Sequence, residues 1–101
     1  MIIKEIVYTG YRNTIELNIS IDGSTELIDH SLLTRCQLNM NGTLIDSAVN
    51  PAYFDMTKAD RIILKLGSAG LPAKNYNATL IIFDDTSVEG LVVGSFLVTV
   101  V

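Results

Sequence analysis

His30 and Cys36 are the only histidine and the only cysteine of this 101-residue chain, so they are the first candidates for catalysis. A thiol beside an imidazole can act as a nucleophile with its general base. Cys36, however, alternates with Leu38 and Met40 on the apolar face of a predicted strand, where a free cysteine behaves as a small hydrophobic residue. We therefore expect a core cysteine and a loop histidine. One residue of each type is also too few for a Cys/His zinc site.

Three carboxylates, those of Asp84, Asp85 and Glu89, fall within the polar segment 84–90. Oxygen-rich loops of this kind attract hard cations such as calcium. The three acids lack the regular spacing of a dedicated calcium loop, so a solvated hairpin turn is the favoured interpretation. Two alternatives stay open, a cation site and a small hydrolase that uses these acids. We expect no enzyme activity, no metal and no cofactor.

Aromatic side chains suggest a further alternative, a module that binds carbohydrate or a host receptor by stacking on sugars. The chain contains no tryptophan, and its aromatic residues are dispersed along the sequence, so core and edge roles are favoured and small-molecule ligands are not expected. The residues concerned are Tyr8, Tyr11, Tyr53, Phe54, Tyr76 and Phe83.

Composition excludes several classes of partner. The net charge is −4, and the seven basic residues are scattered, so no basic cluster is available to neutralise the phosphates of a nucleic acid. No apolar run approaches the length of a membrane span, and no long amphipathic helix is indicated. The charged pair Lys4-Glu5 interrupts the place where a signal peptide would be apolar, and the single cysteine fits a reducing compartment.

The spacing of apolar residues predicts a fold made of strands. Apolar residues recur at every second position in several segments separated by Gly, Pro, Asn and Asp, which is typical of strands joined by turns. Asn41-Gly42 is a strong signal for a tight hairpin. Segment 25–31 is either a short strand or a loop, and segment 48–60 is a loop or one short helix capped by Asp55. The predicted strands are 2–9, 14–21, 33–40, 43–47, 62–66, 76–83 and 91–101.

Seven or eight strands spaced about ten residues apart indicate an all-β domain, an antiparallel β-sandwich that spans residues 1–101. Tyr76 begins a strand just after Leu71-Pro72, a pattern that matches the tyrosine corner of Ig-like sandwiches. In that corner the ring packs inside, and the hydroxyl donates to a backbone carbonyl a few residues upstream. Tyr76 is therefore a structural candidate.

The last two predicted strands are apolar on both faces. Ile81 and Phe83 face opposite to their apolar neighbours, and so do Leu97 and Val101. Because a sheet in a small sandwich buries only one face, the other apolar face must be covered by a loop, by the N-terminal strand or by another subunit. Exposed apolar patches mark interfaces, so these four residues are predicted interface candidates.

The order of features from Thr34 to the C-terminus resembles a family of small Ig-like β-sandwich proteins encoded among the structural genes of tailed bacteriophages and prophages. The resemblance covers about two thirds of the chain. It is carried by strand and turn motifs, namely Thr34-Arg35-Cys36-Gln37-Leu38, Gly42, Ile45-Asp46-Ser47, Leu64-Lys65-Leu66-Gly67, Leu71-Pro72 followed by Tyr76, Ala78 and Leu80, then Phe83-Asp84 and a last strand from Gly90 to Phe96.

This resemblance implies a virion structural or assembly protein of the head, the head–tail connector or the tail. Such a protein is made in the cytoplasm of the host bacterium and is then built into the particle. It is expected to act by self-association or by contacts with other virion proteins, through edge strands, an apolar patch and the loops 48–60 and 84–90. The resemblance implies no catalytic residues.

Overall fold

A computed structural model describes residues 4–20 and 28–101, and it confirms the prediction of an all-β fold. The described residues form eight strands and two short 3-10 helices. Alternating buried and exposed side chains in β3 and β7 follow the period of two that the sequence predicts. The elements are β1 (Lys4–Val7), β2 (Ile15–Leu17), η1 (His30–Leu32), β3 (Arg35–Met40), β4 (Thr43–Asp46), η2 (Pro51–Tyr53), β5 (Phe54–Asp55), β6 (Ile62–Leu64), β7 (Asn75–Phe83) and β8 (Leu91–Val100).

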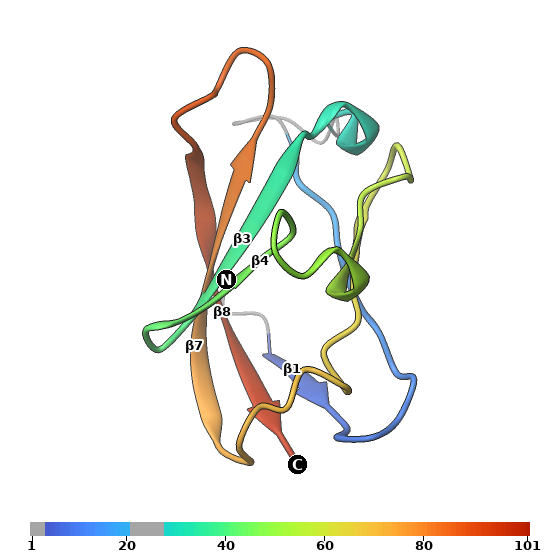
Figure 1. The fold of residues 1–101 in the computed structure, drawn as a ribbon, viewed down its shortest axis with the longest axis vertical. Helices are drawn as coiled ribbons and strands as arrows, with labels where there is room; N and C mark the ends of the chain where they lie inside the picture. The colour runs from blue at the N-terminus through green and yellow to red at the C-terminus, as the bar shows by residue number, and fades with distance from the viewer. Residues whose placement is uncertain (1–3, 21–27) are drawn as a thin grey trace.

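The strands form two sheets that pack face to face (Figure 1). One sheet has five strands in the order β1-β8-β7-β3-β4, and the other has three in the order β2-β6-β5. All pairs are antiparallel except β1 with β8, which is parallel. The prediction of an entirely antiparallel sandwich is therefore wrong at this pair. β1 and β8 come from opposite ends of the chain, so no hairpin forces them to run in opposite directions.

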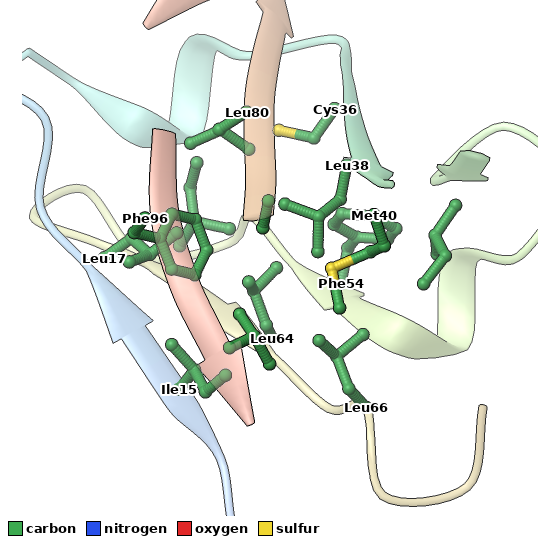
Figure 2. Close-up of a cluster of buried hydrophobic side chains, with 14 of the residues drawn as sticks. Ile15, Leu17, Cys36, Leu38, Met40, Phe54, Leu64, Leu66, Leu80 and Phe96 are labelled. Carbon is green, nitrogen blue, oxygen red and sulfur yellow. The ribbon is translucent and has the colours of Figure 1, made fainter. Parts of the chain in front are cut away.

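The hydrophobic core lies between the two sheets (Figure 2). β3 contributes Cys36, Leu38 and Met40, all fully buried, to a cluster that also contains Leu64 of β6 and Phe54 of β5. Burying a large apolar side chain of this kind stabilises a fold by about 1.5–3 kcal/mol. The alternation read from the sequence therefore identifies the inner face of the larger sheet.

The β3–β4 hairpin has the turn that its sequence predicts. Asn41 and Gly42 both have positive φ, 52° and 92°, as a type I′ turn requires. The turn fixes the register, in which Met40 pairs with Thr43 and Gln37 with Asp46. The hairpin prediction is confirmed, and its register brings polar residues of β3 beside Asp46.

Two predicted segments differ in detail from the structure. In segment 48–60 the helix is a single 3-10 turn, Pro51–Tyr53, and Asp55 is not its cap. Asp55 instead lies in β5 and accepts hydrogen bonds from the backbone N–H (2.9 Å) and the hydroxyl (2.6 Å) of Thr57, because its short side chain folds back onto the following turn. The strand expected over 14–21 is regular only at Ile15–Leu17. The expectations for residues 2–3 and 21–27 lie outside the described residues.

Candidate functional site

Cys36 is a core residue and not a nucleophile. Its side chain is fully buried in β3, and burial raises the pKa of the thiol to about 12. Because the reactive species is the thiolate, a cysteine in this environment is inert near neutral pH. The expectation of a core cysteine is confirmed.

His30 is buried, so the expectation of a loop histidine is wrong. It begins η1 and is fully covered. The Nε2 atom accepts a hydrogen bond from the backbone N–H of Ile19 at 2.9 Å, which makes Nδ1 the protonated nitrogen that donates to the carbonyl of Ala59 at 2.8 Å. Both ring nitrogens form hydrogen bonds with backbone groups, and neither is bonded to Cys36. The apolar residues on both sides of it, Ile28 and Leu33, were the signal in the sequence for a buried position.

The acidic segment 84–90 forms a solvated turn. Oδ1 of Asp84 accepts hydrogen bonds from the hydroxyl (2.9 Å) and the backbone N–H (3.0 Å) of Thr86 and from the backbone N–H of Ser87 (2.6 Å). These bonds, led by the one from the Thr86 hydroxyl, lower the pKa of Asp84. Among the residues that the structure describes, no group of three potential metal ligands occurs. Neither Asp85 nor Glu89 lines the cavity described below.

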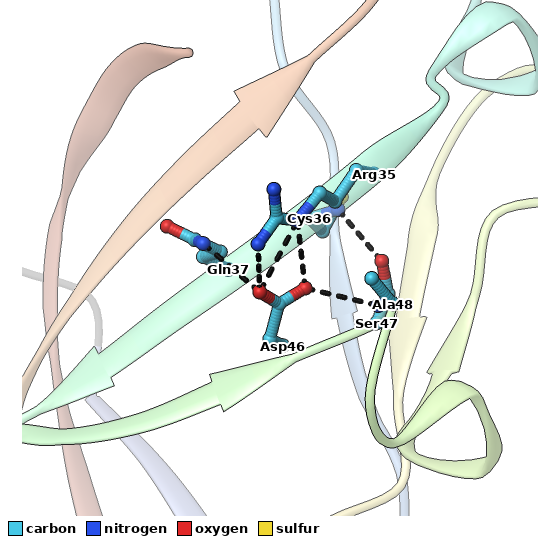
Figure 3. Close-up of polar contacts among 6 residues, drawn as sticks. All are labelled: Arg35, Cys36, Gln37, Asp46, Ser47 and Ala48. Carbon is cyan, nitrogen blue, oxygen red and sulfur yellow. Dashed lines mark hydrogen bonds and ion pairs between the residues drawn. The ribbon is translucent and has the colours of Figure 1, made fainter. Parts of the chain in front are cut away.

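A polar network covers the outer face of the β3–β4 hairpin (Figure 3). Nε of Arg35 donates to both oxygens of Asp46 (2.9 and 3.1 Å), and Gln37 and the backbone N–H of Ala48 also donate to this carboxylate (3.0 and 2.9 Å). The guanidinium of Arg35 holds the pKa of Asp46 far below its usual value, although burial opposes the shift. The network ties the end of β4 to β3 and to the turn that follows β4. Sequence reasoning missed it, although the hairpin register places Asp46 opposite Gln37.

Tyr76 has the structural position that the sequence predicts and is buried in the core. Its hydroxyl donates to the carbonyl of Pro72, four residues upstream, at 2.8 Å. The predicted hydrogen bond is therefore confirmed. Because the ring is covered, Tyr76 does not itself form part of the surface. Its role is to fix the start of β7.

Ile81 and Phe83 lie on the outer face of β7 and are partly covered by the chain's own residues. The guanidinium carbon of Arg35 is 4.9 Å from the centroid of the Phe83 ring. Gly90 packs against both side chains so closely that a Cβ there would lie 2.7 Å from the Phe83 ring and 3.1 Å from Ile81. The polar loop and Arg35 thus cover part of the outer apolar face. Of the three predicted covers, a loop, the N-terminal strand or another subunit, the loop is the one found at this place.

The outer face near β1 and β8 is not covered in this way. Leu97 is exposed on β8, and Val101 is exposed just after it. Val92, opposite Ile81, is 63% exposed on this face, whereas Leu91, opposite the buried Ile82, is 54% exposed on the other face of the strand. We call the exposed apolar side chains of these two strands the β1–β8 apolar edge; they are Ile6, Leu91, Val92, Val93 and Leu97. The sequence analysis identified Leu97 and missed the other four, although the uninterrupted run Leu91-Val92-Val93 was a signal.

One cavity lies where the β1–β2 turn meets the segment after β6. Its volume is about 470 Å³, and its lining includes Tyr11, Arg12 and Lys65. The backbone N–H of Gly10 donates to the carbonyl of Gly67 at 2.9 Å and holds the two segments together. This cavity combines one aromatic ring with two cations and has no acidic lining residue.

Comparison of the chain with models of protein families, with curated proteins and with solved structures finds no match. Within residues 4–20 and 28–101, no helix is long and apolar enough to cross a lipid bilayer.

Proposed function

We propose that this chain is a non-enzymatic structural or assembly protein of a tailed bacteriophage particle, and that it acts through protein–protein contacts. The observation that carries the proposal is the β1–β8 apolar edge. Soluble proteins rarely expose neighbouring large apolar side chains unless a partner covers them. The resemblance of the strand and turn motifs to phage structural proteins supplies the kind of assembly in which such a partner is found.

The strand order supports an Ig-like sandwich. The sheet pairing β8-β7-β3-β4 and the second sheet β2-β6-β5 correspond to the arrangement of strands G-F-C-C′ and B-E-D in Ig-like domains. Tyr76 near the start of β7 takes the place of the corner tyrosine on strand F. Ig-like sandwiches place loops at both ends and edge strands at both sides, and these are the surfaces that the proposed role uses.

The site chemistry also favours binding over catalysis. Cys36 is inert, both ring nitrogens of His30 are occupied by backbone groups, and Asp84 is held within its own turn. Catalysis needs a nucleophile or base that can reach a substrate. Cys36, His30 and Asp84 instead stabilise the fold, so the proposed function depends on contacts made by the surface.

Mass spectrometry of purified particles tests the proposal. Particles of the phage or induced prophage whose genome encodes this chain should contain it in stoichiometric amount after density-gradient purification. A matched pair of variants, Leu97→Asp on the β1–β8 apolar edge and Leu44→Asp on exposed β4, locates the contact. The first should be lost from particles and the second retained. Particles that are complete without the chain would overturn the role.

A second candidate function, the binding of a carbohydrate on the host surface, is favoured by the cavity beside Tyr11. Its volume of about 470 Å³ is within the usual range for small-ligand sites. A tyrosine ring can stack on a sugar, and Arg12 and Lys65 would select an acidic one. A glycan array should then show hits that Tyr11→Ala removes and Tyr8→Ala, at an exposed tyrosine outside the cavity, does not. An array without hits would exclude this function.

A further inference from the structure

The turn between β3 and β4 contains the only Asn-Gly pair of the chain, Asn41-Gly42. Asparagine deamidates most readily when glycine follows it, because the glycine nitrogen can attack the side-chain amide carbon without hindrance from a side chain. Every other asparagine of the chain is followed by a residue with a side chain. Gly42 has a φ of 92°, which favours glycine, so the turn itself calls for the reactive pair.

The side chain of Asn41 extends the pairing between β3 and β7. That pairing runs as far as Met40 opposite Ala78, and Asn41 lies one residue beyond it. Oδ1 of Asn41 accepts a hydrogen bond from the backbone N–H of Asn77 at 3.0 Å, and Nδ2 donates a longer one to the carbonyl of Asn75 at 3.4 Å. A peptide group offers the same acceptor and donor. The side-chain amide thus takes the place of a peptide group at the end of the ladder.

The nitrogen that would attack this amide is also held in the native turn. The backbone N–H of Gly42 donates to Oδ1 of Asn39 at 2.8 Å. Attack requires this nitrogen to lose its proton, and the hydrogen bond to Asn39 is lost with the proton. It also requires the Asn41 side chain to turn from β7 toward its own backbone. Both reacting groups must therefore leave their native contacts before they can meet.

We propose that Asn41 is a site of spontaneous deamidation, and that its contacts with β7 and the Asn39–Gly42 hydrogen bond restrain the rate in the folded chain. The Gly42 nitrogen loses its proton to solvent and bonds to Cγ of Asn41, while the Cγ–Nδ2 bond breaks and Nδ2 takes up a proton and leaves as ammonia. Water then opens the cyclic imide. Cleavage at Cγ gives aspartate, and cleavage at the backbone carbonyl carbon gives isoaspartate.

The products disturb the sheet at the point where Asn41 held it. Aspartate keeps an oxygen that can accept from Asn77, but it places a second oxygen where Nδ2 donated to the carbonyl of Asn75. Isoaspartate lengthens the main chain of a turn whose register sets Met40 opposite Thr43. Each product also adds one negative charge to a chain whose net charge is −4. Deamidation therefore loosens the hairpin from β7, and because it occurs at the β3–β4 side it does not depend on the proposed particle role.

Peptide mapping by mass spectrometry tests the site. The purified chain is incubated at mildly alkaline pH with and without denaturing urea, and the conversion of each asparagine is followed with time. The unfolded chain should convert at Asn41 before any other asparagine. The folded chain should convert at least about tenfold more slowly, because several hydrogen bonds must break first. Equal rates in the two states would overturn the restraint, and an Asn41 that stays intact in urea would overturn the site.

Two substitutions of Asn39 isolate the hydrogen bond to Gly42. Asn39→Ala removes the acceptor at an exposed position and should speed the conversion of Asn41 in the folded chain by about 2–10-fold. Asn39→Asp keeps an oxygen acceptor and should convert no faster than the wild type. If the two variants convert equally fast, the Asn39–Gly42 hydrogen bond does not restrain the reaction.

A third variant separates local opening of the turn from unfolding of the whole chain. Ile82→Val removes a buried methylene group toward the other end of β7 and lowers overall stability without touching the turn. It should leave the conversion rate of Asn41 unchanged. An acceleration equal to that of Asn39→Ala would show that the reaction follows global unfolding, which contradicts the proposal.

Thermal denaturation tests the effect of the product. Asn41→Asp, which reproduces the aspartate product, should lower the melting temperature by about 4–8 °C because the hydrogen bond to Asn75 is lost. Asn13→Asp adds the same charge at an exposed asparagine and should leave the melting temperature unchanged. Equal shifts in the two variants would mean that the Asn41 amide does not hold the hairpin to β7.

Discussion

The two sides of the five-stranded sheet differ in what covers their outer face. At the β3–β4 side, the carboxylate of Asp46 is almost completely buried under Arg35 and Gln37, and all of its hydrogen bonds stay within the chain. At the β1–β8 side, Leu91 and Val92 are exposed, and part of the backbone edge has no described partner. One side is closed by polar contacts, whereas the other is open and apolar.

The inner faces of these two sides do not differ in the same way. Leu38 and Met40 on β3 and Val98 on β8 are all fully buried between the sheets. The contrast is therefore confined to the outer face and the edges. Stability of this chain therefore depends on both sides, whereas the proposed protein–protein contacts use the exposed apolar side chains of the β1–β8 side.

The largest expected effect on stability comes from removing the polar network at the β3–β4 side. Asp46→Ala removes an acceptor for three partners and should reduce the free energy of unfolding by about 2–3 kcal/mol, as measured by urea denaturation. Asp85→Ala removes the same charge from an exposed turn and should change it by less than about 0.5 kcal/mol. Equal losses in the two variants would mean that net charge, rather than the network, stabilises this side.

The same carboxylate should make stability depend on pH. Because Arg35 lowers the pKa of Asp46 in the folded chain below its ordinary value of 3.8, its contribution is fully present above that value and is lost as the pH falls below it. The difference in unfolding free energy between the wild type and Asp46→Asn should therefore shrink between about pH 5 and pH 2. A difference that stays constant over this range would show that the charge of Asp46 contributes nothing.

Tyr76 lies between the two sides, on the strand that joins them. Tyr76→Phe removes the hydrogen bond to Pro72 and should lower the free energy of unfolding by about 1 kcal/mol, measured by thermal and chemical denaturation. Tyr11→Phe, at an exposed tyrosine, is the matched control and should have no effect. An unchanged melting temperature for Tyr76→Phe would mean that the hydroxyl does not hold the start of β7.

The smallest expected effect on stability is at the open side. Val92→Thr keeps a β-branched side chain on an exposed position of β8 and should change the free energy of unfolding by less than about 0.5 kcal/mol. Val98→Thr makes the same replacement at a fully buried position of β8 and should cost about 1–3 kcal/mol because its hydroxyl is buried. Similar costs for the two variants would remove the distinction between an outer face for binding and an inner face for stability.

Local patterns predicted much of the site correctly. The Asn41-Gly42 turn and the alternation in β3 identified both the hairpin and the burial of Cys36, because both depend on neighbouring residues. The Tyr76 hydrogen bond also involves residues only four positions apart. The burial of His30 was missed although Ile28 and Leu33 on either side of it were a local signal, because the hydrogen-bond partners that hold its ring, Ile19 and Ala59, are distant in sequence.

The sequence by itself determined where strands form and which faces turn inward, since a period of two is a property of adjacent residues. Only the tertiary structure decided which strands became neighbours. It placed β1 parallel to β8, folded Gly90 over Phe83, and left the first part of β8 without a described partner on one side. β1 pairs with residues 97–100 of β8, and strand pairing between residues so far apart in the chain leaves no mark in local sequence.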